Sequence, residues 1–172
     1  QASISGGPNF AYDLCVRKIV EEQKATLDLS CWSLAFNGAE PIRHDTLERF
    51  ATAFASCGFR REAFYPCYGL AEGTLIVSGR KRGLPPRVRA FDEASLEQHL
   101  AVEVPQGQKD SRSLVSCGYV PSDQEVVIVD PDTGNELPQG RIGEIWVSGP
   151  SIAQGYWDQP EETLRTFGAR IS

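Results

Sequence analysis

Methionine is missing from all 172 residues of this chain, and histidine occurs only twice. Because translation starts at methionine and this chain opens at Gln1, we expect it to be a piece of a longer protein. Neither His44 nor His99 lies near a nucleophile or a carboxylate in a catalytic pattern, so the sequence predicts surface or capping roles for both.

Long apolar runs and an excess of basic residues are also absent. No stretch approaches the ~18 apolar residues of a membrane span, and the N-terminus lacks the basic and then apolar order of a signal peptide. Membrane insertion and secretion are therefore not expected. With 17 basic and 23 acidic residues, the net charge of −6 argues against a general nucleic-acid surface. Only residues 80–89 hold a cluster of arginine and lysine.

The five cysteines form neither a disulfide framework nor a zinc site. Their number is odd, no CxxC pair occurs, and no histidine stands at metal-ligand spacing from them. This usage predicts a reducing, cytoplasmic compartment. Cys15, Cys31 and Cys57 lie among apolar residues, so we expect them in the core.

The residues that are present predict a globular fold. Hydrophobic residues make up 41% of the chain, and its length is that of one domain. The first half alternates between a helix at residues 9–23, a strand at 32–36, a second helix after Pro41 and a strand at 64–67. This order is typical of a parallel α/β layer.

Local signals mark where these elements begin and end. Gly6-Gly7-Pro8 predicts a turn before the first helix, and Asp45 with Glu48 has the spacing of a capping box at the start of the second. Gly58 suits the end of that helix. Phe10, Phe50 and Phe54 recur at helical spacing, which is more typical of a core than of a binding surface.

The second half of the chain predicts mostly antiparallel strands. A short helix is expected over residues 92–100, with Asp92 as its cap. The expected fold class is thus α/β followed by a β-rich region. The further elements predicted are strands at residues 114–120, 125–130 and 142–148 and a helix at residues 161–167.

Two loops that follow strands are the candidates for chemistry. They are Asn37-Gly38-Ala39-Glu40-Pro41 and Tyr68-Gly69-Leu70-Ala71-Glu72. In an open parallel sheet, ligands bind beyond the carboxyl ends of the strands. Tyr68 offers a stacking face, and the Glu72 carboxylate suits magnesium. The alternative is an ordinary glycine turn, with Tyr68 in the core and Glu72 at a solvated helix start.

Taken together and in order, three motifs resemble the adenylate-forming enzyme superfamily. They are Gly38-Ala39-Glu40-Pro41, Tyr68-Gly69-Leu70-Ala71-Glu72, and residues 143–157, which include Gly143-Glu144-Ile145 and Gly155-Tyr156-Trp157. Within this superfamily the chain most resembles fatty acyl-AMP ligases, on residues 5–15, 68–75 and 91–100. The resemblance covers essentially the whole chain.

The resemblance implies that the chain is part of the large N-terminal domain of such an enzyme. Residues 1–80 would be the end of an α/β subdomain, residues 81–113 a link with a family-type insertion, and residues 114–172 an incomplete, distorted β-barrel subdomain. The family's phosphate loop, ribose-binding aspartate and catalytic lysine would lie outside these residues. We therefore expect the isolated fragment to be inactive.

The resemblance also implies a reaction and its site residues. A fatty acid would be activated with ATP to an acyl adenylate, with Mg²⁺ at the phosphates, and the acyl group would pass to an acyl carrier protein. Glu72 would be the catalytic residue and the metal ligand. The other implied roles are adenine contacts by Gly38, Ala39, Glu40 and Tyr68, α-phosphate contacts by Gly69, Leu70 and Ala71, and an acyl channel lined by Phe10, Ala11 and Leu14.

Two alternatives remain open from the sequence. One is a fatty acyl-CoA synthetase, which shares the adenylation step but uses free CoA. The other is a non-catalytic nucleotide-binding or carrier-docking module, against which the presence of both Tyr68 and Glu72 counts. Residues 87–106 resemble the insertion that distinguishes fatty acyl-AMP ligases from CoA-using relatives.

Overall fold

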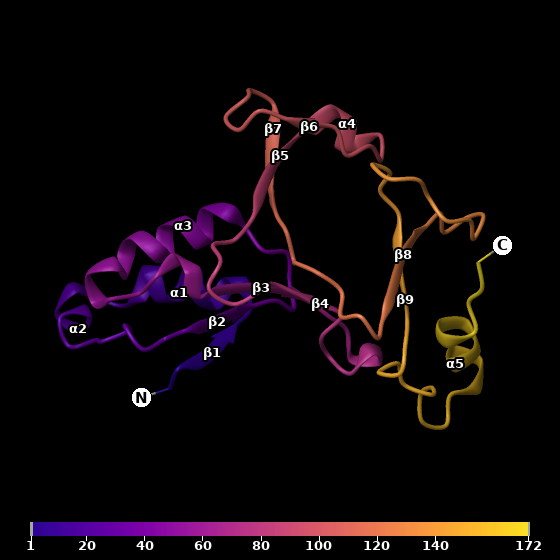
Figure 1. Ribbon diagram of the computed structural model, residues 1–172, viewed down its shortest axis with the longest axis horizontal. Helices are drawn as coiled ribbons and strands as arrows, with labels where there is room; N and C mark the ends of the chain where they lie inside the picture. The colour runs from indigo at the N-terminus through magenta and orange to yellow at the C-terminus, as the bar shows by residue number, and fades with distance from the viewer. Residues whose placement is uncertain (1, 172) are drawn as a thin grey trace. The chain divides into compact units, whose positions relative to one another are not determined.

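A computed structural model describes residues 2–171, which divide into two compact units (Figure 1). Unit 1 comprises residues 2–68, Ser78–Arg89 and Ser113–Tyr119, and unit 2 comprises Gly69–Val77, Ala90–Arg112 and residues 120–171. The units interleave along the chain, whereas the three ranges expected from the sequence were consecutive; those ranges remain a prediction about the longer protein. No helix within the described residues is long and apolar enough to cross a membrane.

Unit 1 is built on a four-stranded sheet of order β1-β2-β3-β4. The strands β1 (Ile4–Gly7), β2 (Leu34–Asn37) and β3 (Phe64–Tyr68) are parallel, and β4 (Ser78–Gly79) is antiparallel to β3. Helices connect β1 to β2 and β2 to β3. The predicted parallel α/β layer is therefore confirmed.

Strand β1 replaces the turn that was predicted at Gly6-Gly7. A Cβ atom added to Gly6 would lie 2.1 Å from the carbonyl oxygen of Phe36 on the neighbouring strand. The glycine is thus required by close packing between two strands, which the sequence pattern does not distinguish from a turn.

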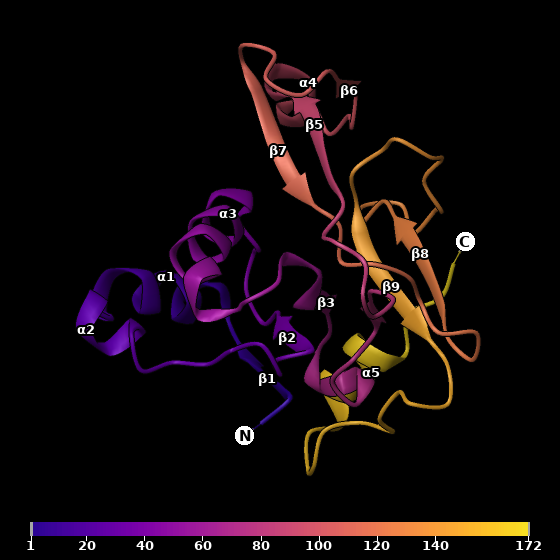
Figure 2. The ribbon, with the colours of Figure 1, turned by 60° about the vertical axis from the view of Figure 1, so that its left-hand side comes forward.

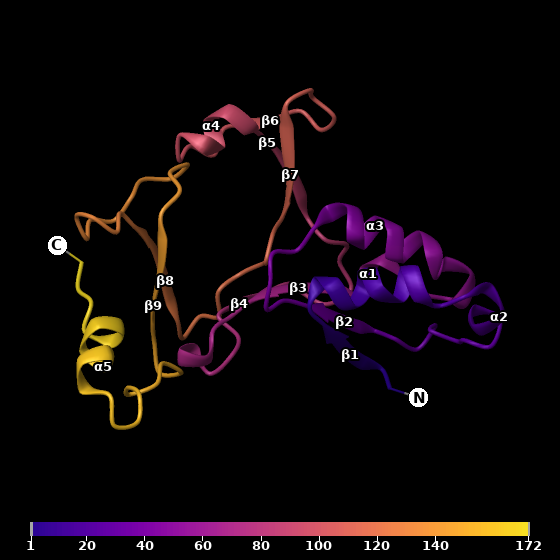
Figure 3. The same ribbon diagram turned by 180° about the vertical axis from the view of Figure 1, so that it is seen from behind.

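Helices α1 (Asn9–Lys18) and α3 (His44–Ala53) cover one face of this sheet, as the two opposite views in Figures 1 and 3 show. An aromatic core forms between them, in which Phe50 lies 5.0 Å from Tyr12 and 4.9 Å from Phe59 between ring centroids. Phe50 and Phe54 are buried as predicted. Phe10 is 58% exposed, so its assignment to the core was wrong: it lies on the outer face of α1.

The cysteine prediction holds in part. Cys57 is buried in the core cluster and Cys15 packs against it while remaining half-buried. Cys31 is half-buried and does not belong to that cluster. All five cysteines are free.

Two helix boundaries in unit 1 differ from the prediction. The first helix ends at Lys18 rather than continuing to residue 23, because Ile19 and Val20 adopt extended conformations before the short helix α2 (Glu21–Lys24). Ile19 packs against the core, which redirects the chain. The capping box at Asp45 is also wrong: α3 starts after Arg43 with no side-chain cap, and Glu48 pairs with Arg61.

Unit 1 also contains two short 3-10 helices, η1 (Ala55–Cys57) and η2 (Arg61–Ala63). The first of them extends α3, so the helical segment ends at Gly58, whose φ of 85° is left-handed. The predicted end at this glycine is confirmed.

The strands of the second half pair antiparallel, as predicted. A three-stranded sheet has the order β6-β5-β7, formed by β5 (Val88–Asp92), β6 (Glu103–Val104) and β7 (Ser111–Val115). In unit 2, β8 (Glu125–Val129) and β9 (Glu144–Ser148) form a hairpin, seen clearly in Figure 2. These sheets have open edges, and none of those within residues 2–171 closes into a barrel.

The strand expected at residues 114–120 begins and ends earlier. β7 covers Ser111–Val115, because Gly118 takes a left-handed φ of 90° and cannot continue a strand. Beyond β9, helix α5 (Pro160–Phe167) starts with a proline at its first turn, close to the predicted range.

The short helix α4 (Glu93–Glu97) begins after Asp92 as predicted. The Asp92 carboxylate accepts hydrogen bonds from the Ser95 main-chain N–H at 2.8 Å and from the Ser95 hydroxyl at 2.6 Å. The helix ends earlier than residue 100, because His99 adopts a left-handed φ of 58°.

Candidate functional site

The first candidate loop begins where β2 ends. Gly38 is buried, and a Cβ atom there would lie 2.9 Å from Cys67 Sγ on β3, so the main chain of the loop runs tightly against the neighbouring strand. Ala39, at a left-handed φ of 66°, and Glu40 are exposed. Their main chain is therefore accessible at the carboxyl end of the parallel strands, where open α/β sheets bind ligands.

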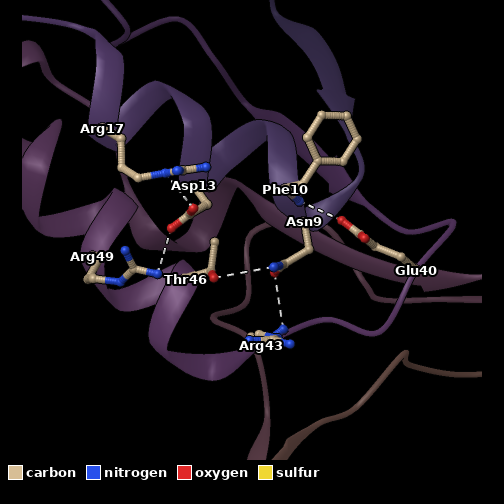
Figure 4. A network of polar contacts seen from close by, with 8 residues as sticks. All are labelled: Asn9, Phe10, Asp13, Arg17, Glu40, Arg43, Thr46 and Arg49. Atoms are coloured by element: carbon tan, nitrogen blue, oxygen red, sulfur yellow. Dashed lines mark hydrogen bonds and ion pairs between the residues drawn. The ribbon is translucent and has the colours of Figure 1, made fainter.

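The loop is clamped to the start of α1 (Figure 4). Glu40 Oε1 accepts a hydrogen bond from the Phe10 main-chain N–H, a first-turn donor that has no partner within the helix. Asn9 Oδ1 accepts from the Arg43 N–H at 3.1 Å, and Asn9 Nδ2 donates to Thr46 Oγ1 at 3.2 Å. The Glu40 side chain thus fixes the loop, and its main chain remains available to a ligand.

A second set of contacts ties the two helices beside this loop together. The Asp13 carboxylate on α1 pairs with Arg17 at 2.8 Å and with Arg49 of α3 at 2.7 Å, as Figure 4 also shows. Both arginines are largely exposed, so each pair contributes little stability by itself. Because Arg49 joins α3 to α1, these ion pairs favour a fixed orientation of α1, whose first-turn N–H binds Glu40.

Asn37, which ends β2 and is the first residue of this loop, carries a fully buried side-chain amide. Neither its oxygen nor its nitrogen has a hydrogen-bond partner among the described residues. An unpartnered buried polar group costs about 1–3 kcal/mol. A buried amide that no group in residues 2–171 satisfies therefore lies at the end of β2.

The second loop follows β3 and enters unit 2 at Gly69. Its turn is tight: a Cβ atom on Gly69 would lie 1.5 Å from the carbonyl oxygen of Leu75. Thr74 and Leu75 both adopt left-handed φ angles, of 55° and 78°. Such residues cost about 1–3 kcal/mol each and occur where a loop shape is functionally required. Tyr68, the last residue of β3, is half-buried and pairs with Ser78 on β4.

Glu72 lies in the 3-10 helix η3 (Ala71–Gly73) of unit 2. Its Oε1 accepts a hydrogen bond from the phenol of Tyr156. This bond is the main cause that lowers the pKa of Glu72, and it raises the pKa of Tyr156. Glu72 also lines a cavity of about 890 Å³ whose walls come from β8, β9 and the segment at and after α5. The carboxylate is therefore both ionised and accessible.

The donor set at Glu72 fits magnesium. Magnesium is usually held by one or two carboxylates, with water and substrate phosphates completing its octahedron, rather than by an all-protein cage. Accordingly, residues 2–171 contain no group of three histidine, cysteine or acidic side chains that could hold a metal ion. No arginine or lysine in this part of the chain pairs with Glu72, so its charge remains available to a cation.

Comparison with known proteins decides the family. Residues 3–157 match the family described as AMP-binding enzyme. The chain belongs to this AMP-binding enzyme family.

Three relatives of the AMP-binding family are similar over almost the whole chain. One is a fatty acyl-adenylate ligase from Legionella pneumophila, whose crystal structure is a complex with acyl adenylate and pyrophosphate. Its sequence is 50% identical to this chain and the TM-score is 0.89. The match covers 95% of this chain and 28% of that protein. The medium-chain-fatty-acid acyl-carrier-protein ligase JamA of Moorena producens is 47% identical over 98% of this chain and 29% of its own length. A Mycobacterium tuberculosis protein named as a fatty-acid-CoA ligase is 43% identical over 98% of this chain and 28% of its length. The chain thus spans less than a third of each.

Within this AMP-binding chain, the predicted site residues fall in both units. Gly38, Ala39, Glu40 and Tyr68 belong to unit 1, and residues 69–72 belong to unit 2. Phe10 and Leu14 are 58% and 41% exposed on α1, while Ala11 is half-buried. Their roles toward a ligand remain predictions.

Sequence reasoning missed two residues of this site. Asn9 holds the first loop, and Tyr156 holds Glu72. The only signal for Tyr156 was its place in the Gly155-Tyr156 motif, which says nothing about a partner 84 residues earlier. No sequence signal identified Asn9.

Proposed function

We propose that this chain is the adenylate-binding part of a fatty acyl-AMP ligase, which activates a fatty acid with ATP and passes the acyl group to an acyl carrier protein. The observation that carries the proposal is the Glu72 carboxylate, which is ionised, accessible and follows β3 in the loop Tyr68-Gly69-Leu70-Ala71-Glu72. The 50% identity to a ligase with bound acyl adenylate and pyrophosphate supports it.

The predicted site residues take different parts of the nucleotide. In unit 1, the main chain of Gly38, Ala39 and Glu40 lies along the adenine, and Tyr68 stacks on it. In unit 2, the main chain of residues 69–71 approaches the α-phosphate, and Glu72 binds Mg²⁺.

The reaction proceeds in two balanced steps. A carboxylate oxygen of the fatty acid attacks the α-phosphorus of ATP, the bond to the bridging oxygen breaks, and pyrophosphate leaves with that electron pair. The thiol of a phosphopantetheine arm then loses its proton to solvent and its sulfur attacks the acyl carbonyl carbon. The bond from that carbon to the phosphate oxygen breaks, and AMP leaves with that electron pair. Residues of this chain contribute by orienting the phosphates and by holding negative charge where the cation is needed. Bound Mg²⁺ offsets charge on the phosphates.

The fatty acid chain is proposed to pass along the exposed face of α1. Phe10 and Leu14 are four residues apart, which places them on one face of the helix, and both are exposed. Ala11 beside them is small and half-buried. Since Phe10 also donates its main-chain N–H to Glu40, this face begins directly beside the first candidate loop.

A second candidate for the acyl acceptor is free CoA, which the M. tuberculosis relative's name favours. The name of JamA favours a carrier protein. The full-length protein that carries this sequence distinguishes them when it is supplied with ATP, a medium-chain fatty acid and either acceptor. We expect acyl transfer to the phosphopantetheinylated carrier protein and only background formation of acyl-CoA. Efficient acyl-CoA synthesis would favour the second candidate.

Adenylation itself is tested with Glu72→Ala in the same full-length protein. Loss of a carboxylate beside the reacting phosphates should reduce fatty-acid-dependent ATP-pyrophosphate exchange by at least about 100-fold, while folding changes little. Glu22→Ala, at an exposed glutamate on α2, is the matched control and should exchange at the parental rate. Parental exchange by Glu72→Ala would contradict the assignment, and absence of exchange in the parent would favour a non-catalytic binding module.

A further inference from the structure

Tyr156 forms a hydrogen bond with Glu72, the candidate metal ligand. Its phenol donates a hydrogen bond to Glu72 Oε1 although the two residues are 84 positions apart. The Glu72 carboxyl also receives a hydrogen bond from its own main chain, and the bond from Tyr156 is the larger cause of its lowered pKa. The Tyr156 phenol therefore restrains the Glu72 carboxylate from a distant part of the sequence.

The ring and main chain of Tyr156 are themselves anchored to α5. The ring packs edge-on against Phe167, with centroids 5.3 Å apart. The Tyr156 N–H donates to Thr163 Oγ1 at 2.9 Å. Gly155 allows this approach, because a Cβ atom there would lie 2.4 Å from Thr163 Cγ2. The phenol thus has a defined position before it meets Glu72.

Hydrogen bonds to main-chain atoms also join the segment around Tyr156 to the segment around Glu72. The Ala153 N–H donates to the Glu72 carbonyl oxygen at 2.8 Å, and the Thr74 hydroxyl donates to the Ser151 carbonyl oxygen. Together with the phenol, these bonds connect residues 151–156 to residues 72–74 at three points. Every one of these contacts lies within unit 2.

We propose that Tyr156 is a positioning residue for the cation site at Glu72. Its hydrogen bond to Oε1 restrains the carboxylate, so that this group presents a fixed orientation to a divalent cation. Mutation of a residue that orients a metal ligand by a hydrogen bond typically weakens metal binding by about 10- to 100-fold. The proposal rests on the proposed function, since it assigns to Glu72 the role of metal ligand.

The competing explanation is that Tyr156 only packs residues 151–167 together. The variant Tyr156→Phe separates the two, because it removes the hydroxyl and keeps the ring against Phe167. Tyr119→Phe, at a residue 61% exposed in unit 1, is the matched control. Both are made in the full-length protein, and their thermal midpoints are compared with that of the parent.

The first readout is cation binding rather than activity. Mn²⁺ is titrated in the presence of a non-hydrolysable ATP analogue, and free Mn²⁺ is measured by electron paramagnetic resonance. We expect Tyr156→Phe to weaken Mn²⁺ binding about 10- to 100-fold at an unchanged thermal midpoint, while Tyr119→Phe binds like the parent. The Mg²⁺ concentration for half-maximal pyrophosphate exchange should rise by a similar factor, with KM for ATP at saturating Mg²⁺ unchanged. Parental Mn²⁺ binding by Tyr156→Phe overturns the proposal.

A double variant distinguishes failure of this proposal from failure of the proposed function. If Tyr156 acts through Glu72, adding Tyr156→Phe to Glu72→Gln should cause no further loss of Mn²⁺ binding. A further loss of the same size overturns the positioning role but leaves the function standing. Parental Mn²⁺ binding and exchange by Glu72→Gln alone would overturn both.

If Tyr156→Phe does not fold, Thr163→Val provides the test. It removes the acceptor of the Tyr156 N–H and keeps the tyrosine side chain itself. We expect weaker Mn²⁺ binding than in the parent, because the phenol loses part of its anchorage; parental binding overturns the proposal.

Discussion

At the scale of single residues, the candidate site relies mostly on main chain. Gly38 lies against Cys67 and Gly69 against Leu75, both more closely than any side chain permits. Such approaches expose main-chain groups to a ligand at a defined place. The side chains differ in what they do: Glu40 and Asn9 hold the first loop by hydrogen bonds, and Glu72 supplies the negative charge of the second loop.

Tyr68 is expected to act on nucleotide affinity. In the full-length protein, Tyr68→Ala should raise KM for ATP with a smaller effect on kcat, because loss of base stacking costs about 1–3 kcal/mol, or roughly 5- to 150-fold. Tyr68→Phe keeps the ring and should behave like the parent. Steady-state pyrophosphate exchange at varied ATP measures both. If Tyr68→Ala left KM unchanged, Tyr68 would belong to the core instead.

At the scale of elements, sequence patterns predicted those stabilised locally. α4 starts at its Asp92 cap, and β8 and α5 lie close to their predicted ranges. The predicted elements that were wrong depend on long-range contacts. β1 exists because Gly6 fits against Phe36, and α1 ends early because Ile19 turns toward the core.

In the candidate site, too, the sequence predicted local features but not long-range contacts. Motifs located its loops, since their glycines and polar residues are consecutive in sequence. They could not reveal that Tyr156 bonds Glu72 or that Asn9 bonds the main chain of Arg43, because both contacts depend on how distant segments pack.

The α4 cap should depend on pH. Hydrogen bonds from the Ser95 hydroxyl and N–H lower the pKa of Asp92 below its usual value of 3.8. The cap therefore stabilises α4 fully above that usual pKa, and its contribution is lost as pH falls through the lower folded-state pKa. The protection factor of the Ser95 amide, measured by NMR hydrogen exchange above and below pH 3.8, should fall in this window. Asp92→Asn keeps the cap without titrating, so its exchange should lack this step.

The segment containing α4 is proposed to set the acyl acceptor. Asp92 N–H donates to the Val102 carbonyl oxygen at 3.0 Å, so residues 93–101 can be replaced by Asn-Gly as a two-residue hairpin turn that retains β5 and β6. Full-length protein with this replacement should keep pyrophosphate exchange and form acyl-CoA above the parental background. Asp92→Asn, which keeps α4, is the control. An unchanged acyl-CoA background would show that α4 does not exclude CoA.

At the scale of the whole molecule, the proposed chemistry needs more than this chain supplies. The chain spans 28–29% of the length of the relatives compared above. Positioning and charge stabilisation act jointly in phosphoryl transfer, so a subset of the groups does not give a proportional share of the rate.

Residues 1–172 expressed alone should therefore form no measurable acyl adenylate from ATP and a fatty acid, whereas the full-length protein does. Large apolar side chains such as Trp157 and Leu164, 94% and 73% exposed, should also make the isolated chain prone to self-association. Pyrophosphate exchange tests the first expectation, and sedimentation velocity with a hydrophobic dye tests the second. Adenylation by the isolated chain at the full-length rate would mean that residues 1–172 contain every group the first step requires.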